Sequence, residues 1–485
     1  MADSTLSALE QRGVRTVRMT YPDLHGISRG KDYPLSHIAH VAGDGGTYCE
    51  AIMTVDLRHN VVAGFEHGFQ DILARPDLET LVPVPWEPDT AWCLADLFRM
   101  DGSVYGVDPR AALKRAIEGY AEFGVSPVIG PELEFYLCVP DPEAPHGYRR
   151  YVNNPSHVYT VGHVADPRGV LTTMLHACVD MGLGAIAANH EYGRSQYEIN
   201  LMHGPALDAA DRAFRFKAVV KDLAAREGLL ATFIGKPWND DEGSGFHLHI
   251  SLADKDGRNA LNGDGDEGLS PMARHLIGGL LEHGPGLMAF FNPTTNAYRR
   301  LHPEALVPTL VSWGHDNRLT LARVPRERGG ATRVEFRVGD GAANPYLAIA
   351  AALFAGLDGI KREIEPPAPL EGLIYEQPEI ETMTPLPTTF EEALDALEAD
   401  TVLTEAMGSE LVRIFRVIKD AELARARQTV TDWEFAEYTH HLYHGGTQGS
   451  PVSPSLRGAR IAVGAPARRG LAGDCVLTRQ TGSDP

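Results

Sequence analysis

The sequence predicts an α+β protein, and three observations lead to this fold class. Short extended segments such as 14–19 fill the first hundred residues, between turn signals such as the one at 21–23. After them, strand patterns alternate with helical patterns, which is typical of one large domain. The last stretch shifts to Gly, Pro, Ser, Ala and Arg with almost no periodicity. We therefore expect a small β-rich domain over 1–104, a large domain over 105–445 and a flexible tail over 446–485.

Local signals set the order of the elements. The segment 81–86 contains two prolines and resembles a connector more than the interior of a strand. A helix is expected over 109–123, because Asp108 suits the N-cap and Gly124 suits the residue after the end. A second, strongly apolar helix is expected over 345–365.

The composition excludes several classes of protein. The chain has 485 residues, of which 43% are hydrophobic and 22% charged, so it is not a disordered or fibrous polymer. Its formal net charge of −21 disfavours nonspecific binding to nucleic acid or to anionic membranes. The longest apolar stretch, 346–357, is shorter than the roughly 20 residues of a membrane-spanning helix. The scattered cysteines and the start without a signal-peptide pattern predict a cytoplasmic protein with reduced thiols.

Four predicted strands carry polar side chains on one face. They cover 128–138, 197–201, 245–252 and 332–338. Because side chains alternate along a strand, residues two positions apart share a face. The polar faces hold, in chain order, Glu132 and Glu134; Glu198 and Asn200; His247, His249 and Ser251; and Arg333, Glu335 and Arg337. Glu191 precedes the second strand across a Gly-Arg-Ser turn.

A single such strand is more often a surface strand with a solvated face. Four of them, with five carboxylates and two imidazoles, indicate a shared site. If these faces converge, the carboxylates raise one another's pKa unless cations neutralise them. Ligation mainly by oxygen, with one or two imidazoles, suits Mg²⁺ or Mn²⁺ better than Zn²⁺. The arginines beside them point to an anionic substrate or a phosphoryl group. Any ATP site is not of the P-loop type, because the Walker A sequence is missing.

Several motifs together resemble the glutamine synthetase family, type I. They are Gly-Pro-Glu-Leu-Glu-Phe at 130–135, Gly-Ser-Gly-Phe-His-Leu-His at 243–249, the run 292–301, and 333–337 followed by 342–347. The resemblance extends over about residues 14–440. It implies an N-terminal β-grasp domain and a catalytic domain with a curved antiparallel sheet. It also implies a homo-dodecamer of two stacked hexameric rings, with each active site at a subunit boundary.

The resemblance also implies roles for individual residues. One metal site would be formed by Glu134, Glu191 and Glu198, and a second by Glu132, His247 and Glu335. L-glutamate would be bound by Gly243, Arg300 and Arg337, with Arg318 near the transferred phosphate. The nucleotide would be contacted by His249, Ser251, Arg318, Arg323 and Arg333. The implied cofactors are ATP and two or more Mg²⁺ or Mn²⁺ ions per site. In the implied reaction, ATP converts the γ-carboxylate of glutamate to an acyl phosphate, which an amine then attacks.

The sequence departs from the ammonia-using members of the family. The position of their ammonium-binding aspartate falls near Val62, and that of their flap glutamate at Leu306. The usual asparagine before Gly243 is Glu242. Loss of both acids predicts a bulkier amine, such as a polyamine, ethanolamine or another monoamine. Glu242 and Glu304 could then pair with a distal ammonium group.

Two alternatives remain. One is an ammonia-using glutamine synthetase whose ammonium site is built from other residues, for example Glu304. The other is a noncatalytic assembly protein of the same fold. Retention of all six implied metal ligands and four arginines disfavours the second, because unmetallated carboxylates held together are destabilising.

Overall fold

The computed structural model describes residues 2–153, 158–302, 305, 307–373 and 382–439. Two residues of the expected amine site, Glu304 and Leu306, and the expected tail 446–485 lie outside the described residues. Contacts within the chain divide it into two units, Met1–Gln428 and Thr429–Pro485. The second unit contains the short helix α12 (Asp432–Tyr438). Everything that positions the candidate site belongs to the first unit.

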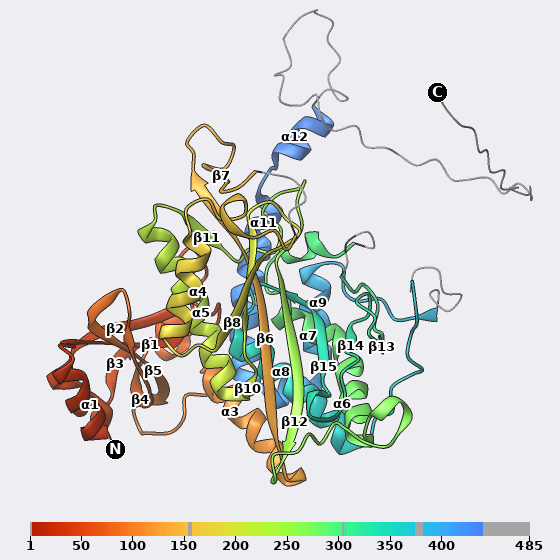
Figure 1. The fold of residues 1–485 in the computed structure, drawn as a ribbon, viewed down its shortest axis with the longest axis horizontal. Coiled ribbons are helices and arrows are strands. Elements are labelled where there is room, and N and C mark those ends of the chain that lie inside the picture. The colour runs from red at the N-terminus through yellow and green to blue at the C-terminus, as the bar shows by residue number, and fades with distance from the viewer. Residues whose placement is uncertain (1, 154–157, 303–304, 306, 374–381, 440–485) are drawn as a thin grey trace, which may run out of the picture. The chain divides into compact units, whose positions relative to one another are not determined.

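The N-terminal part forms a five-stranded sheet in the order β2-β1-β5-β4-β3 (Figure 1). The strands are β1 (Thr16–Pro22), β2 (Ser28–Pro34), β3 (Gly46–Cys49), β4 (Asp71–Val84) and β5 (Glu87–Arg99). The helices α1 (Ala2–Gln11) and α2 (Ile38–Asp44) accompany them. The strand β1 runs antiparallel to β2 and parallel to β5. This is the small N-terminal sheet that the sequence predicts.

The prediction of a connector at 81–86 is wrong. The strand β4 continues to Val84, and its residues Val82 and Pro83 pair with Trp92 and Ala91 of β5. Pro83 is tolerated because it lies at a register shift near the strand end, where a missing backbone N–H removes little of the ladder. Only the two residues before β5 form the turn.

The large domain is built on a second, mostly antiparallel sheet. Its strands follow the order β13-β14-β15-β12-β6-β9-β8, and the short strands β7, β10 and β11 also pair with β6. Their bounds are β6 (Val125–Pro140), β7 (Tyr148–Arg150), β8 (Ala185–His190), β9 (Gln196–Leu201), β10 (Gly204–Pro205), β11 (Leu230–Thr232), β12 (Gly245–Asp254), β13 (Trp313–His315), β14 (Ala322–Val324) and β15 (Val334–Asp340). In Figure 1, β6 and β12 run side by side through the centre of the domain as its two long strands. The predicted α+β class, with a small N-terminal sheet before a curved antiparallel one, is confirmed.

Helices complete the domain. They are α3 (Pro109–Gly119), α4 (Val170–Asp180), α5 (Ala206–Arg226), α6 (Pro271–Glu282), α7 (Gly284–Phe291), α8 (Pro345–Arg362), α9 (Phe390–Ala399), α10 (Thr401–Met407) and α11 (Ser409–Gln428). The predicted cap of α3 is present: the Asp108 side chain accepts a hydrogen bond from Arg110 N, and a 3₁₀ turn ends at Gly124 with φ of 67°. The helix expected over 345–365 ends earlier, at Arg362, because Glu363 adopts φ of 54°. Within the described residues, no helix has the length and apolar character needed to cross a membrane.

A buried ion-pair network joins the N-terminal sheet to the helices. Arg110, which is only 1% exposed, donates to Asp96 of β5 at 2.6 Å and to Asp77 of β4 at 2.8 Å. It also donates twice to Asp211 of α5, at 2.8 and 3.0 Å, and Asp211 accepts the Tyr346 hydroxyl of α8 at 2.7 Å. The network therefore links two strands of one sheet to three helices that pack behind the other.

Candidate active site

The four strands with polar faces are neighbours in the large sheet, in the order β15-β12-β6-β9. The register pairs His247 of β12 with Glu132 of β6, and Glu134 of β6 with Glu198 of β9. On the other side of β12, His249 pairs with Glu335 of β15. The structure therefore brings together the polar faces that the period-two pattern identified separately.

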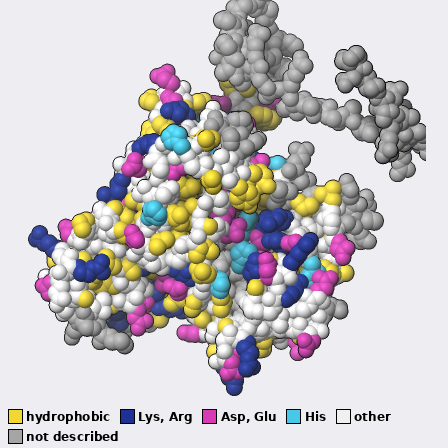
Figure 2. Space-filling model, in the orientation of Figure 1, with side chains coloured by type: hydrophobic (Ala, Val, Ile, Leu, Met, Phe, Trp, Pro, Cys, Tyr) yellow, Lys and Arg dark blue, Asp and Glu magenta, His cyan; other side chains and the backbone are white. Residues whose placement is uncertain are grey.

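These faces line one cavity of about 800 Å³. Fourteen of the predicted site residues line it: Glu132, Glu134, Glu191, Glu198, Glu242, Gly243, His247, His249, Arg300, Arg318, Arg323, Arg333, Glu335 and Arg337. Figure 2 shows basic, acidic and histidine side chains gathered side by side on the viewed face of the large domain. Ser251 is not among the residues that line the cavity, and its hydroxyl donates to the Thr332 carbonyl at 3.1 Å.

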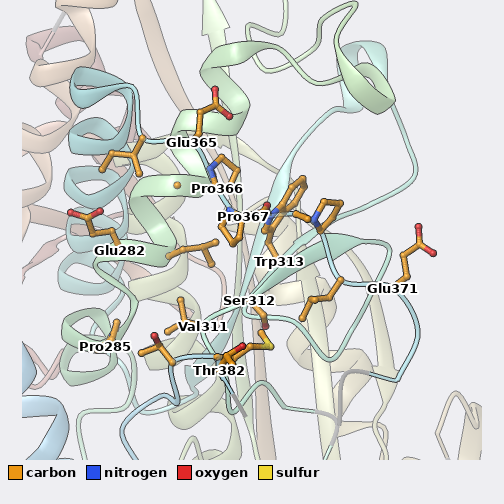
Figure 3. Close-up of a pocket in the computed structure, with 18 residues that line it drawn as sticks. Glu282, Pro285, Val311, Ser312, Trp313, Glu365, Pro366, Pro367, Glu371 and Thr382 are labelled. Carbon is orange, nitrogen blue, oxygen red and sulfur yellow. Dashed lines mark hydrogen bonds between the residues drawn. The ribbon is translucent and has the colours of Figure 1, made fainter. Parts of the chain in front are cut away.

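A second cavity, of about 930 Å³, lies beside α6 and a proline-rich segment that ends near Glu371 (Figure 3). It is lined by Trp313, Pro366 and Pro367 among others, and two of its acids, Glu282 and Glu365, form ion pairs. Glu282 forms an ion pair with Arg362 at 2.7 Å, and Glu365 with Arg274 at 2.8 Å. This cavity lacks the convergent carboxylates and arginines of the first, so we assign the candidate site to the first.

Glu132, His247 and Glu335 form a group that could bind a metal ion. One ligand atom from each lies within 4.8 Å of those of the others. His247 Nδ1 is 3.1 Å from Glu132 Oε1 and 3.8 Å from Glu335 Oε1. Burial opposes ionisation of Glu335, but Arg337 and the two histidines lower its pKa to about 2. Burial is likewise outweighed at Glu132, where His247 and His249 hold the pKa well below its usual range. The donor set fits Mg²⁺ or Mn²⁺, because both carboxylates are charged at neutral pH.

The other predicted metal ligands form a crowded acidic wall of the same cavity. Burial and the neighbouring carboxylates Glu132 and Glu134 raise the pKa of Glu198 to about 10. Burial and Glu134 raise the pKa of Glu191 to about 7. Among the described residues, Glu132, His247 and Glu335 are the only set of three or more His, Cys, Asp or Glu side chains whose ligand atoms all lie within 4.8 Å of one another. The excess negative charge of this wall fits a bound cation, which would allow Glu134, Glu191 and Glu198 all to ionise.

Arginines surround the metal-binding group. Arg323 donates to Glu335 Oε2 and to Asp316 Oδ1, each at 2.6 Å. Arg337 pairs with the other oxygen of Glu335 and donates to the Arg318 carbonyl at 3.2 Å. Arg318 itself is exposed to the cavity. Cationic groups beside oxygen ligands can bind an anionic substrate and the charge of a transferred phosphoryl group.

Arg300 and Gly243 form a tight corner of the cavity. Arg300 is buried and donates to Asn292 Oδ1 at 3.2 Å. A Cβ atom at Gly243 would lie 2.6 Å from Arg300 Cγ, so only glycine fits against this side chain. Glu242 is exposed and lines the cavity, while Val62 is half-buried in the N-terminal part, where its N–H donates to the Thr54 carbonyl at 3.0 Å.

Sequence reasoning missed several residues of the cavity. Asn189 donates to Glu191 Oε1 at 2.6 Å, and Gln196 donates to Glu134 Oε2 at 2.7 Å. The period of two from Glu198 back to Gln196 was a usable signal for the second of these. Tyr159 and Tyr192 also line the cavity, with 71% and 59% of their surface exposed. Their position in loops gives no periodic pattern, so the sequence carried no sign of them.

Comparison with known proteins places this geometry in a family. The family model described as "Glutamine synthetase, catalytic domain" matches residues 106–438. A glutamine synthetase of Pyrococcus abyssi is 36% identical over 447 residues, which cover 88% of this chain and 97% of that protein. A glutamine synthetase of Thermus thermophilus is 35% identical over 446 residues, covering 89% and 97%.

Solved structures agree with the fold. A complex of GmaS, gamma-glutamylmethylamide synthetase, with ADP superposes with a TM-score of 0.80 at 34% identity, covering 90% of this chain and 99% of that one. A structure described as a novel glutamine synthase homolog gives a TM-score of 0.76 at 26% identity, covering 89% and 99%.

Proposed function

The chain belongs to the glutamine synthetase family, and we propose that it joins the γ-carboxylate of L-glutamate to an organic amine with cleavage of ATP. Members of this family are ATP-dependent ligases that form carbon–nitrogen bonds, and this protein is such an enzyme. The family uses ATP and divalent metal ions. The proposal therefore concerns the acceptor amine and the residues that act on the substrates.

The observation that carries the proposal is the lining of the cavity of about 800 Å³: its acids and histidines come mainly from four adjacent strands, and its arginines come from β14, β15 and neighbouring segments. Glu132, His247 and Glu335 would hold one divalent ion, and Glu134, Glu191 and Glu198 another. Such ions neutralise the charge of phosphoryl oxygens. Arg300 and Arg337 would bind glutamate, and Arg318 would stabilise the phosphoryl group in transfer.

The reaction then runs in two steps. The γ-phosphoryl group of ATP passes to an oxygen of the γ-carboxylate, giving ADP and a γ-glutamyl phosphate. The neutral amine attacks the acyl carbon, inorganic phosphate leaves with that oxygen, and the amine loses a proton. Activation is needed because a carboxylate has no good leaving group, whereas phosphate is one. His249, Arg323 and Arg333 would contact the nucleotide; for Ser251 this role stays a prediction.

Three features support an organic amine rather than ammonia. The position of the ammonium-binding aspartate of ammonia-using members falls near Val62, in the segment 60–64, which contains no acid. Two exposed tyrosine rings, Tyr159 and Tyr192, line the cavity beside the acidic wall. Aromatic rings next to carboxylates favour an alkylammonium group, which is both apolar and cationic. The similarity to GmaS points in the same direction.

Ammonia remains the second candidate acceptor, because the similar proteins of Pyrococcus abyssi and Thermus thermophilus are named glutamine synthetase. The noncatalytic alternative is excluded by the ligase class of the family. We further propose a catalytic domain over 105–445, a homo-dodecamer of two stacked hexameric rings and a cytoplasmic location.

The test is phosphate release from ATP with L-glutamate and Mg²⁺, run in parallel with ammonium, methylamine, ethanolamine, putrescine and spermidine. We expect turnover with at least one organic amine at a higher kcat/KM than with ammonium. Turnover with ammonium alone would contradict the organic acceptor and favour glutamine synthesis. The mass of the product identifies the amine incorporated.

A further inference from the structure

Four consecutive backbone carbonyls at the rim of the cavity are each held by a side chain. Arg194 donates to the Asp240 carbonyl at 2.9 Å, and Lys236 donates to that of Asp241. The Tyr136 hydroxyl donates to the Glu242 carbonyl at 2.7 Å, and the Gln196 amide to the Gly243 carbonyl at 2.9 Å. The segment 240–243 is therefore fixed along its whole length by side chains outside it.

Gln196, which is only 1% exposed, differs from the other three donors because both ends of its side-chain amide form hydrogen bonds. Its Oε1 accepts the Gly193 N–H at 2.8 Å, which fixes the orientation of the amide. Its Nε2 then donates to the Gly243 carbonyl at 2.9 Å and to Glu134 Oε2 at 2.7 Å. Both amide hydrogens are thus used, one on the rim segment and one on a carboxylate of the acidic wall.

The bond to Glu134 also selects which oxygen that carboxylate offers to the cavity. Oε2 accepts two hydrogen bonds, from Gln196 Nε2 at 2.7 Å and from Gly245 N at 2.8 Å. A carboxylate held in this way by one oxygen keeps the lone pairs of the other, Oε1, for a cation. Glu134 is therefore prepared to bind a metal ion through a single oxygen.

We propose that Gln196 is a positioning residue that holds Glu134 and the segment 240–243 in one fixed geometry. Binding of a divalent cation at Glu134 and binding of glutamate beside Gly243 then both depend on the same buried amide. The glutamate part of this inference rests on the proposed function, whereas the cation part does not. Gln196 lies outside the motifs that carry the family resemblance, and these motifs do not predict its bonds to Glu134 and Gly243.

Two variants test the proposal. Gln196→Met keeps the length and apolar stem but removes the amide. Gln196→Glu keeps the shape but places a second carboxylate against Glu134 and the Gly243 carbonyl. Mn²⁺ binding to the full-length protein is measured by titration without substrates, and the KM for glutamate is measured with the best amine. Loss of a group that orients a metal ligand weakens binding about 10–100-fold, so we expect a loss of this size for Mn²⁺ and a raised KM for glutamate in both variants.

Asn344 supplies matched controls, because it is a buried amide whose bonds lie away from the cavity. Its Nδ2 donates to the Asp23 carbonyl at 2.9 Å, and its Oδ1 accepts the Tyr346 N–H at 3.0 Å. Asn344→Leu and Asn344→Asp should lower the thermal midpoint but leave Mn²⁺ binding and the KM for glutamate unchanged.

The outcomes separate this proposal from the proposed function. If both Gln196 variants bind Mn²⁺ as the wild type does and differ only in thermal midpoint, the amide is merely structural and the positioning role is overturned, while the function stands. If the wild type turns over amines but the Gln196 variants lose no more Mn²⁺ affinity than the Asn344 variants do, the positioning role is likewise overturned and the proposed function stands. If the wild type neither binds Mn²⁺ nor releases phosphate with any amine, both proposals fail.

Discussion

Replacement of Arg110 by methionine should destabilise the protein strongly, although Arg110 lies outside the cavity. Its guanidinium makes bonds to Asp77, Asp96 and Asp211 at 2.6 to 3.0 Å. Methionine preserves much of the apolar stem and removes the charge. The variant therefore tests the network that joins the N-terminal sheet to the helices behind the catalytic sheet.

The size of the effect follows from what each aspartate retains. Asp96 keeps Lys114 at 2.7 Å and is partly exposed, as Asp77 is. Asp211 is buried and keeps only the neutral Tyr346 hydroxyl from this network. Leaving a buried charge without its partner costs about 3–5 kcal/mol, so the free energy of unfolding should fall by that amount, mostly through Asp211. Arg110→Met combined with Asp211→Asn should recover part of the loss.

Urea denaturation followed by circular dichroism measures the change, with Arg416→Met as the control. Arg416 also contacts three carboxylates, Asp395, Glu398 and Asp420, at 2.9 to 3.1 Å, but all three are exposed. Exposed ion pairs contribute about 0–1 kcal/mol, so this variant should change little. Equal losses for Arg110→Met and Arg416→Met would refute the argument that burial of the network decides its contribution.

Four further predictions concern the site and its support. Glu335→Ala should abolish phosphate release with every amine, because it removes a metal ligand and leaves Arg323 and Arg337 without their shared partner. Near-normal activity would show that the metal site of Glu132, His247 and Glu335 is misassigned. Leu306→Glu should raise kcat/KM for ammonium relative to larger amines, and an unchanged ratio would count against the position of the flap acid. Tyr192→Val should lower the preference for alkylamines, whereas Tyr148→Val, an exposed tyrosine outside the cavity lining, should not. Burial lowers the pKa of Lys217 from its ordinary value of 10.5 to about 7 in the folded protein. Between these two values the unfolded chain binds one more proton than the folded protein, so the stability of the wild type should rise from pH 7 to 9. The urea midpoint of Lys217→Met should lack this rise, and a rise parallel to that of the wild type would exclude Lys217 as its source.

The polar faces of the catalytic sheet were predictable because strand periodicity is local. Glu132 and Glu134, or His247 and His249, share a face by their spacing alone, and the register of β6, β12 and β15 then brings the faces together. The cap of α3 at Asp108 was predictable for the same reason, since its partner is two residues away. Prolines gave a misleading signal at 81–86, because a strand tolerates them near its end.

Contacts between distant parts of the chain were not predictable from spacing. The Arg110 network joins residues from β4, β5, α5 and α8, and no local pattern identifies them as partners. Gln196 lies one residue before the predicted strand 197–201, and its bonds to Gly243 and Glu134 depend on where these two residues meet in space. Tyr159 and Tyr192 lie in loops, where only the fold places their rings at the cavity.

The central claim is that the γ-carboxylate of glutamate is activated by phosphorylation before an amine displaces the phosphate. Glutamate labelled with oxygen-18 in its γ-carboxylate tests this most directly, with ATP, Mg²⁺ and the preferred amine present. Mass spectrometry of the released inorganic phosphate should show one labelled oxygen for each amide formed, because the carboxylate oxygen leaves with the phosphate. Unlabelled phosphate formed together with the amide would contradict the claim.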